Sequence, residues 1–91
     1  MKSTLKILFA DDDLKYSLVL KRFLEREGYE VTYTGNGTMA LEQFPVVKPD
    51  LVLLDINMPG LNGFEVAEKI REQDRHVLIF FLSDLPIRTT V

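Results

Sequence analysis

Three runs of consecutive hydrophobic residues divide the chain, at positions 7–10, 51–54 and 77–82. Each run ends at an acidic or hydroxyl residue. Continuous apolar runs of this length are typical of strands buried on both faces, as in a parallel sheet. A fourth segment, 29–34, alternates hydrophobic and polar residues instead. That alternation predicts an edge strand with one wetter side.

The segments between these strands show helical spacing. The first predicted helix covers residues 14–27, with Asp13 as its N-cap and Gly28 as the residue that stops it. The hydrophobic positions that recur at helical spacing in it are Leu14, Leu18, Val19 and Phe23. A second helix is expected over 37–44 and a third over 63–73.

Two details of the second helix depend on single residues. Pro45 is expected to end it, because proline lacks the backbone N–H that a helix interior needs. Asn36-Gly37 could also form a hairpin turn, but no second alternating run follows, so the helix start is preferred. Strands that alternate with helices predict an α/β fold with a parallel sheet and helices on both faces.

Composition narrows the class of protein. The 91 residues suffice for one domain, 1–91, and 46% hydrophobic residues argue against disorder. A net charge of −3 without a basic cluster argues against direct nucleic-acid binding. The absence of cysteine excludes thiol chemistry. No apolar run approaches the roughly 20 residues of a membrane span, and no signal-peptide pattern follows the N-terminus, so we expect a cytoplasmic protein without membrane contact.

The residues that follow the strands carry the candidate chemistry. Aspartates occupy positions 11–13, Asp55 follows the third strand, and Ser83 and Asp84 follow the fourth. Parallel sheets bind ligands beyond the carboxyl ends of their strands. Crowded carboxylates repel unless a cation intervenes, and oxygen-only ligands favour Mg²⁺ before Ca²⁺. A carboxylate can also accept a phosphoryl group, in a reaction that depends on positioning and charge neutralisation.

A simpler interpretation competes with this one. An aspartate after a strand often serves only as a helix N-cap, and this role is preferred for Asp13. For Asp11, Asp12 and Asp55 taken singly, the cap and the site are equally good interpretations. Their joint placement at the ends of two buried strands favours a site, because such repulsion is costly for structure alone.

These residues match a known family. Segment 6–13 resembles the opening strand and acidic pair of response-regulator receiver domains. Segment 49–63, with its D-x-x-M-P-G-x-x-G pattern from Asp55 to Gly63, resembles their phosphoacceptor strand and loop. Segment 77–83 resembles their fourth strand with its terminal hydroxyl residue. The resemblance covers essentially the whole chain and implies a flavodoxin-like, doubly wound sheet of strand order 2-1-3-4-5.

The resemblance also implies roles for individual residues. Asp55 would be phosphorylated by a histidine kinase or a small phosphodonor, in a reaction that requires Mg²⁺. Asp12 would bind the metal directly, and Asp11 directly or through water. Asp55 and the backbone carbonyl of Asn57 would be further ligands. Ser83 would be the switch hydroxyl that moves toward the phosphate. The domain would be a switch for an output domain or a downstream protein, and not a turnover enzyme.

Two departures from the family pattern matter. Asp84 stands where the family usually has a small residue, and it either caps a following helix or adds negative charge near the phosphate. The family continues through a fifth strand, which carries a phosphate-contacting lysine, and a fifth helix, and no lysine follows Lys69 here. A receiver without its fifth strand would expose the fourth as an edge. We therefore predict a homodimer, by edge pairing or by a swapped C-terminal segment.

Two other functions remain as alternatives. The chain could be a degenerate receiver that docks partners without phosphorylation, as the missing lysine and Asp84 suggest. It could also be a Mg²⁺-dependent phosphohydrolase with an aspartate nucleophile after the first strand. Residues 11–15 do not follow the D-x-D pattern, with a small residue and threonine after it, that such enzymes usually have.

Overall fold

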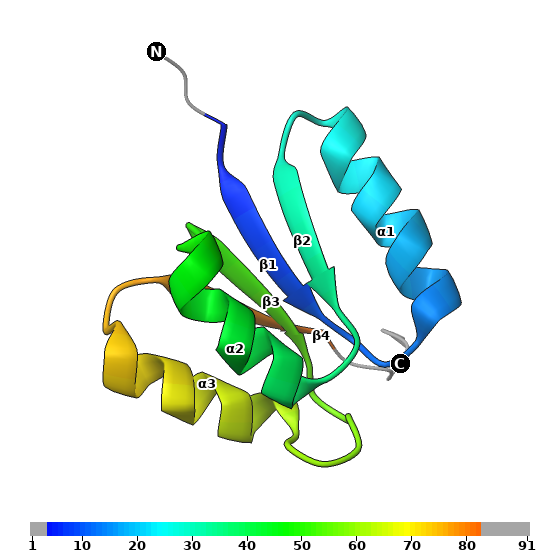
Figure 1. Cartoon of the computed structure of the whole chain (residues 1–91). Helices are drawn as coiled ribbons and strands as arrows, with labels where there is room; N and C mark the ends of the chain where they lie inside the picture. The colour runs from blue at the N-terminus through cyan, green and yellow to red at the C-terminus, as the bar shows by residue number, and fades with distance from the viewer. Residues whose placement is uncertain (1–3, 83–91) are drawn as a thin grey trace, which may run out of the picture.

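A single parallel sheet of four strands organises the chain (Figure 1). The computed structural model describes residues 4–82, so the predictions for Ser83, Asp84 and the C-terminal segment lie outside it. The strands are β1 (Lys6–Ala10), β2 (Glu30–Thr34), β3 (Leu51–Asp55) and β4 (Leu78–Leu82). Their order is β2-β1-β3-β4, and all three pairings are parallel. The predicted α/β fold and the edge position of β2 are both confirmed.

The two central strands, β1 and β3, are almost entirely buried. Their backbones pair in register, with Ile7 opposite Leu51 and Ala10 opposite Leu54. After their first residue, every residue of each strand is buried. This burial explains why the sequences of both strands are continuous hydrophobic runs. It also means that the residues following Ala10 and Leu54 leave the sheet side by side.

Three helices cover the two faces of the sheet. Helix α1 (Leu14–Arg26) lies on one face, and α2 (Gly37–Val47) and α3 (Gly63–Gln73) lie together on the other (Figure 1). The larger core cluster forms between the sheet and α2 and α3, with Ala40, Phe44, Val66 and Ile70 as its helical members. The smaller one forms under α1, where Leu20 and Leu24 pack against it.

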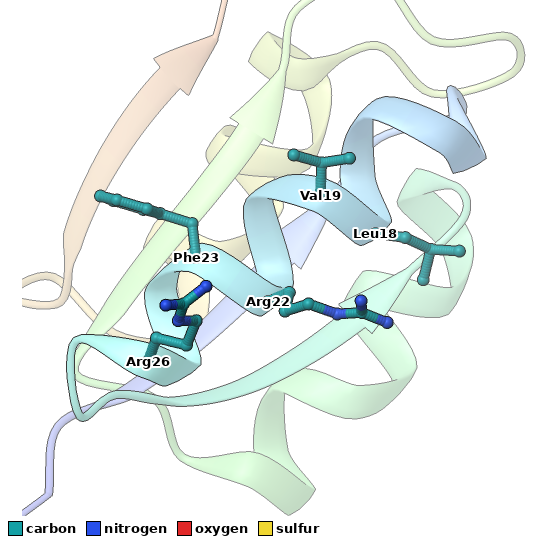
Figure 2. A pocket seen from close by; sticks show the side chains of 5 residues that line it. All are labelled: Leu18, Val19, Arg22, Phe23 and Arg26. Carbon is teal, nitrogen blue, oxygen red and sulfur yellow. The ribbon is translucent and has the colours of Figure 1, made fainter.

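The apolar residues whose spacing predicted α1 are not the residues that it buries. The helix turns Ser17, which is fully buried, with Leu20 and Leu24 toward the sheet. The four residues at helical spacing are exposed: Leu14, Leu18, Val19 and Phe23. Figure 2 shows three residues of this exposed stripe, Leu18, Val19 and Phe23, which line a shallow groove together with Arg22 and Arg26. A helix with two apolar stripes satisfies the helical pattern in either orientation, so periodicity could not select the inward one.

Helix α2 also differs from its prediction, because it continues past Pro45 to Val47. Proline removes one backbone donor, but the backbone N–H of Lys48 donates to the carbonyl of Phe44 at 3.0 Å, so helical bonding resumes beyond it. The helix ends at Lys48, which takes the left-handed conformation with φ 53°. Its start is as predicted, since the Asn36 side chain accepts a hydrogen bond from the backbone N–H of Met39.

Strand β4 is the second edge of the sheet within residues 4–82. It pairs only with β3, and its side chains are half-buried or exposed rather than buried on both faces as predicted. Leu78 and Phe80 are exposed, while the ring of Phe81 packs against that of Phe64 on α3. The backbone N–H of Ile56 donates to the carbonyl of Leu82, which ties the end of β4 to the loop after β3.

Candidate functional site

Three of the predicted site residues come together at the carboxyl end of the central strands. Asp11 and Asp12 follow β1, and Asp55 is the last residue of β3. Carboxylate oxygens of all three lie within 4.8 Å of one another. Asp11 is 5% exposed and Asp55 is 4% exposed, whereas Asp12 faces solvent. The site is therefore a small acidic cup with a buried floor and one open side.

The loop between β1 and α1 is held by hydrogen bonds to Asp11 and Asp13. The backbone N–H of Asp13 donates to Oδ1 of Asp11 at 2.9 Å. Asp13 in turn caps α1, accepting from the backbone N–H of Tyr16 at 3.1 Å, as predicted. Neighbouring β2 contributes two further bonds: the Thr34 carbonyl accepts from the Asp11 N–H at 3.2 Å, and the Tyr33 hydroxyl donates to the Asp11 carbonyl at 2.5 Å.

The loop after β3 wraps closely around Asp55. The backbone N–H of Asn57 donates to Oδ1 of Asp55 at 3.3 Å, and the N–H of Gly63 donates to the carbonyl of Ile56 at 2.9 Å. Gly63 packs so tightly that a Cβ there would lie 2.5 Å from the carbonyl oxygen of Asp55. The start of α3 is thus built directly against the backbone of Asp55. Glycine is required at this position by close approach rather than by an unusual φ.

Burial is the largest influence on the pKa of Asp11. It raises the pKa of the Asp11 carboxyl above its usual 3.8, and the negative charges of Asp12 and Asp13 raise it further. Hydrogen bonds from the backbone of Asp13 and with the side chain of Asp55 lower the pKa but do not cancel the effect of burial. The ionised cup is consequently under electrostatic stress, which a bound cation would relieve.

Replacing Asp11 by asparagine should raise the free energy of unfolding at pH 7 in the absence of metal. The folded pKa of Asp11 is raised, so its ionised form weakens the fold above that pKa. As pH falls through the folded pKa toward the unfolded value, this penalty disappears. The stability gap between Asp11→Asn and the wild type should therefore be largest near pH 7 and close toward pH 4.

Urea unfolding in EDTA, followed by circular dichroism at several pH values, measures that gap. Asparagine keeps the Oδ1 that accepts from the Asp13 N–H, so the variant loses the charge and preserves this bond. A variant less stable than the wild type at pH 7 would contradict the expectation.

The donor set fits a hard divalent cation. Three carboxylates with no histidine or cysteine are oxygen ligands, which Mg²⁺ and Ca²⁺ prefer, and the open side leaves room for water or a phosphate oxygen. Asn57 lies two residues beyond Asp55, in the loop that borders the cup. Ser83 lies outside the described residues. Tyr33 was not identified from the sequence, because its contact with Asp11 depends on strand pairing that local patterns do not reveal.

Comparison with known proteins agrees with this geometry. Residues 7–87 match the family model of the response regulator receiver domain. Sporulation initiation phosphotransferase F from Bacillus subtilis is 32% identical over 86% of this chain and 63% of its own length. The sensor protein EvgS from Escherichia coli K12 is 40% identical over 87% of this chain, which spans only 7% of that protein.

Solved structures show the same fold. The response regulator TrrA from Thermotoga maritima, crystallised with Mg²⁺-BeF, is 40% identical with a TM-score of 0.86 over 91% of this chain and 72% of its own. The chemotaxis protein CheY4 from Vibrio cholerae is 28% identical with a TM-score of 0.87 over 97% of this chain and 72% of its own. No helix within residues 4–82 is long and apolar enough to cross a membrane. From the family match, the sheet order and the acidic cup, we conclude that the chain belongs to the response regulator receiver domains of two-component systems.

Proposed function

We propose that the domain is a phosphoacceptor switch in which Asp55 receives a phosphoryl group in a Mg²⁺-dependent reaction. The observation that carries the proposal is the clustering of Asp55 with Asp11 and Asp12, with carboxylate oxygens within 4.8 Å of one another. A nearly buried carboxylate surrounded by like charge is costly for structure alone. It suits a site whose working form contains both a cation and a phosphate.

Each residue then has a chemical role. A carboxylate oxygen of Asp55 attacks the phosphorus of the donor, forming a new P–O bond as the bond from phosphorus to the leaving group breaks. Asp11 and Asp12 would hold Mg²⁺, with the Asn57 carbonyl as a further ligand. When bound, Mg²⁺ supplies neutralisation of the charge on the transferring group. We assign Ser83 the role of the hydroxyl that moves toward the phosphate. The reaction modifies the domain itself, so it is not turnover catalysis.

The comparisons also support a proposal for the partners. The histidine kinase ThkA has been crystallised with TrrA, whose chain in that complex is 39% identical with a TM-score of 0.84 over 96% of this chain. We propose a histidine kinase as phosphodonor, in the cytoplasm, and an output domain or downstream protein as receiver of the signal. The match covers only 28% of the transcriptional regulatory protein PhoP of Bacillus subtilis, so that relative is much longer than the matched segment. The predicted homodimer finds no support among the relatives, and we do not include it.

The test is the intact mass of the protein after incubation with acetyl phosphate and Mg²⁺, with wild type beside Asp55→Asn. We expect a gain of about 80 Da, one phosphoryl group, in the wild type only. Pre-treatment with EDTA should abolish the gain. Asparagine preserves the shape and the oxygen that accepts from the Asn57 N–H, but its amide cannot form the acyl phosphate.

Two results would favour the alternatives. If neither protein gains mass while Mg²⁺ still binds, the chain is a docking module that does not use phosphorylation. If inorganic phosphate accumulates well beyond one equivalent from a generic phosphoester, the chain is a phosphohydrolase.

A further inference from the structure

Tyr33, on the edge strand β2, touches the acidic cup from the side. Its ring packs against that of Phe9, its register partner on β1, with ring centroids 5.5 Å apart. Its hydroxyl donates to the backbone carbonyl of Asp11 at 2.5 Å, across 22 positions of sequence. The half-buried ring therefore packs against the core, while the hydroxyl bonds to the loop that carries two of the three carboxylates.

The carbonyl that Tyr33 holds is part of the peptide group that joins Asp11 to Asp12. A peptide group is planar, so fixing its oxygen sets the direction in which the chain leaves toward Asp12. The other polar groups of Asp11 are held as well, its N–H by the carbonyl of Thr34 and its Oδ1 by the N–H of Asp13. Tyr33 supplies the side-chain bond that holds the backbone carbonyl of Asp11.

Asp12 depends on this backbone more than its neighbours do. Its side chain is exposed, and among residues 4–82 its carboxylate has no hydrogen bond or ion pair. Asp11 and Asp55 are both buried and hydrogen-bonded. The place of the Asp12 carboxylate in the cup is thus set by the orientation of the peptide before it, and that peptide is held by the Tyr33 hydroxyl.

We propose that Tyr33 is a positioning residue for the cation site, acting through the Asp11–Asp12 peptide. The inference rests on the proposed Mg²⁺-dependent function. A ligand that is already in place loses less conformational freedom when the cation binds, so affinity is higher. Groups that orient metal ligands without touching the metal typically contribute 10- to 100-fold in affinity.

The substitution Tyr33→Phe separates the two contributions of the residue. Phenylalanine keeps the ring that packs on Phe9 and removes only the hydroxyl. Tyr29→Phe is the matched control, because it removes a tyrosine hydroxyl just before the start of β2, at the opposite end of the strand from the cup. If Tyr33 were merely structural, its hydroxyl would affect stability and leave Mg²⁺ affinity unchanged.

The experiment is a titration with Mg²⁺ alone, without phosphodonor, by calorimetry on the 91-residue chain. We expect a dissociation constant about tenfold higher in Tyr33→Phe and unchanged in Tyr29→Phe. Amide NMR shifts of Asp12 and Asp13 during the same titration report on folded molecules only. They give the affinity even if the variant is partly unfolded.

The outcomes separate this inference from the function on which it rests. Equal Mg²⁺ affinity in Tyr33→Phe and wild type, with wild type phosphorylated by acetyl phosphate, would overturn the role of Tyr33 and leave the proposed function standing. A wild type that binds no Mg²⁺ and gains no phosphoryl group would overturn both. An equal loss of affinity in Tyr29→Phe would show a general effect of removing a hydroxyl and would also overturn the proposal.

Discussion

Truncation of Phe9 to alanine is expected to lower the free energy of unfolding by about 3–5 kcal/mol. Phe9 is fully buried in β1 and belongs to the core cluster on the α1 side, with Ile7, Val31 and Leu53. The central strands around it cannot collapse into the cavity, because both are fixed by their hydrogen-bonded neighbours. Since small domains are stable by only about 0.05–0.15 kcal/mol per residue, this is a large share of the total.

Urea unfolding followed by far-ultraviolet circular dichroism measures the loss, since the chain has no tryptophan to serve as a fluorescent probe. Phe64→Ala is the matched control: Phe64 is 55% exposed and contacts the ring of Phe81, with centroids 4.9 Å apart. Its truncation should cost less than about 1.5 kcal/mol, the usual range for an aromatic pair. Equal losses in both variants would mean that burial of Phe9 does not set its contribution.

Gly63→Ala is expected to lower the free energy of unfolding by about 1–3 kcal/mol and to weaken Mg²⁺ binding as well. The added Cβ would meet backbone atoms, 2.5 Å from the Asp55 carbonyl oxygen and 3.0 Å from the Cα of Ile56. Backbone cannot rotate away as a flexible side chain can. Either α3 moves outward or the end of β3 moves, and the second displacement carries Asp55 out of the cup.

Gly35→Ala is the control for this substitution. A Cβ at Gly35 would meet only the Tyr33 hydroxyl at 3.9 Å, an ordinary contact. Its effect should stay within about 0.5 kcal/mol, as for most surface substitutions. Stability is measured by urea unfolding and metal binding by calorimetry. Wild-type stability and Mg²⁺ affinity in Gly63→Ala would show that the start of α3 does not constrain the phosphoacceptor.

The central strands were predictable because a strand buried on both faces has hydrophobic residues at consecutive positions of the sequence. β1 and β3 are central, and both appear as continuous apolar runs. Helix α1 shows where the pattern stops being sufficient, since a polar residue, Ser17, faces the core while Val19 is 70% exposed. Which face of such a helix is buried depends on its packing against the sheet. Pro45 shows a second limit, because α2 continues for two residues past a proline that removes one of its backbone donors.

The acidic cup was predictable for a similar reason. Asp11, Asp12 and Asp55 follow strands that had to be parallel, and parallel strands end at one edge of the sheet. The contribution of Tyr33 could not be predicted in this way. It requires knowing that Tyr33 is level with Phe9, which is a matter of register and not of local sequence.

The position of β1 between β2 and β3 has a consequence for synthesis on the ribosome. Among the four described strands, β1 is the first to be made, yet one of its edges stays unpaired until residues 51–55 have been translated. Parallel strands pair slowly, because the chain loses the entropy of closing a long loop before the strands gain their contacts. The nascent chain therefore exposes one edge of an apolar strand while residues 11–50 are being translated. The cup is completed only at the end of that interval, because Asp55 is the last of its three carboxylates to be made.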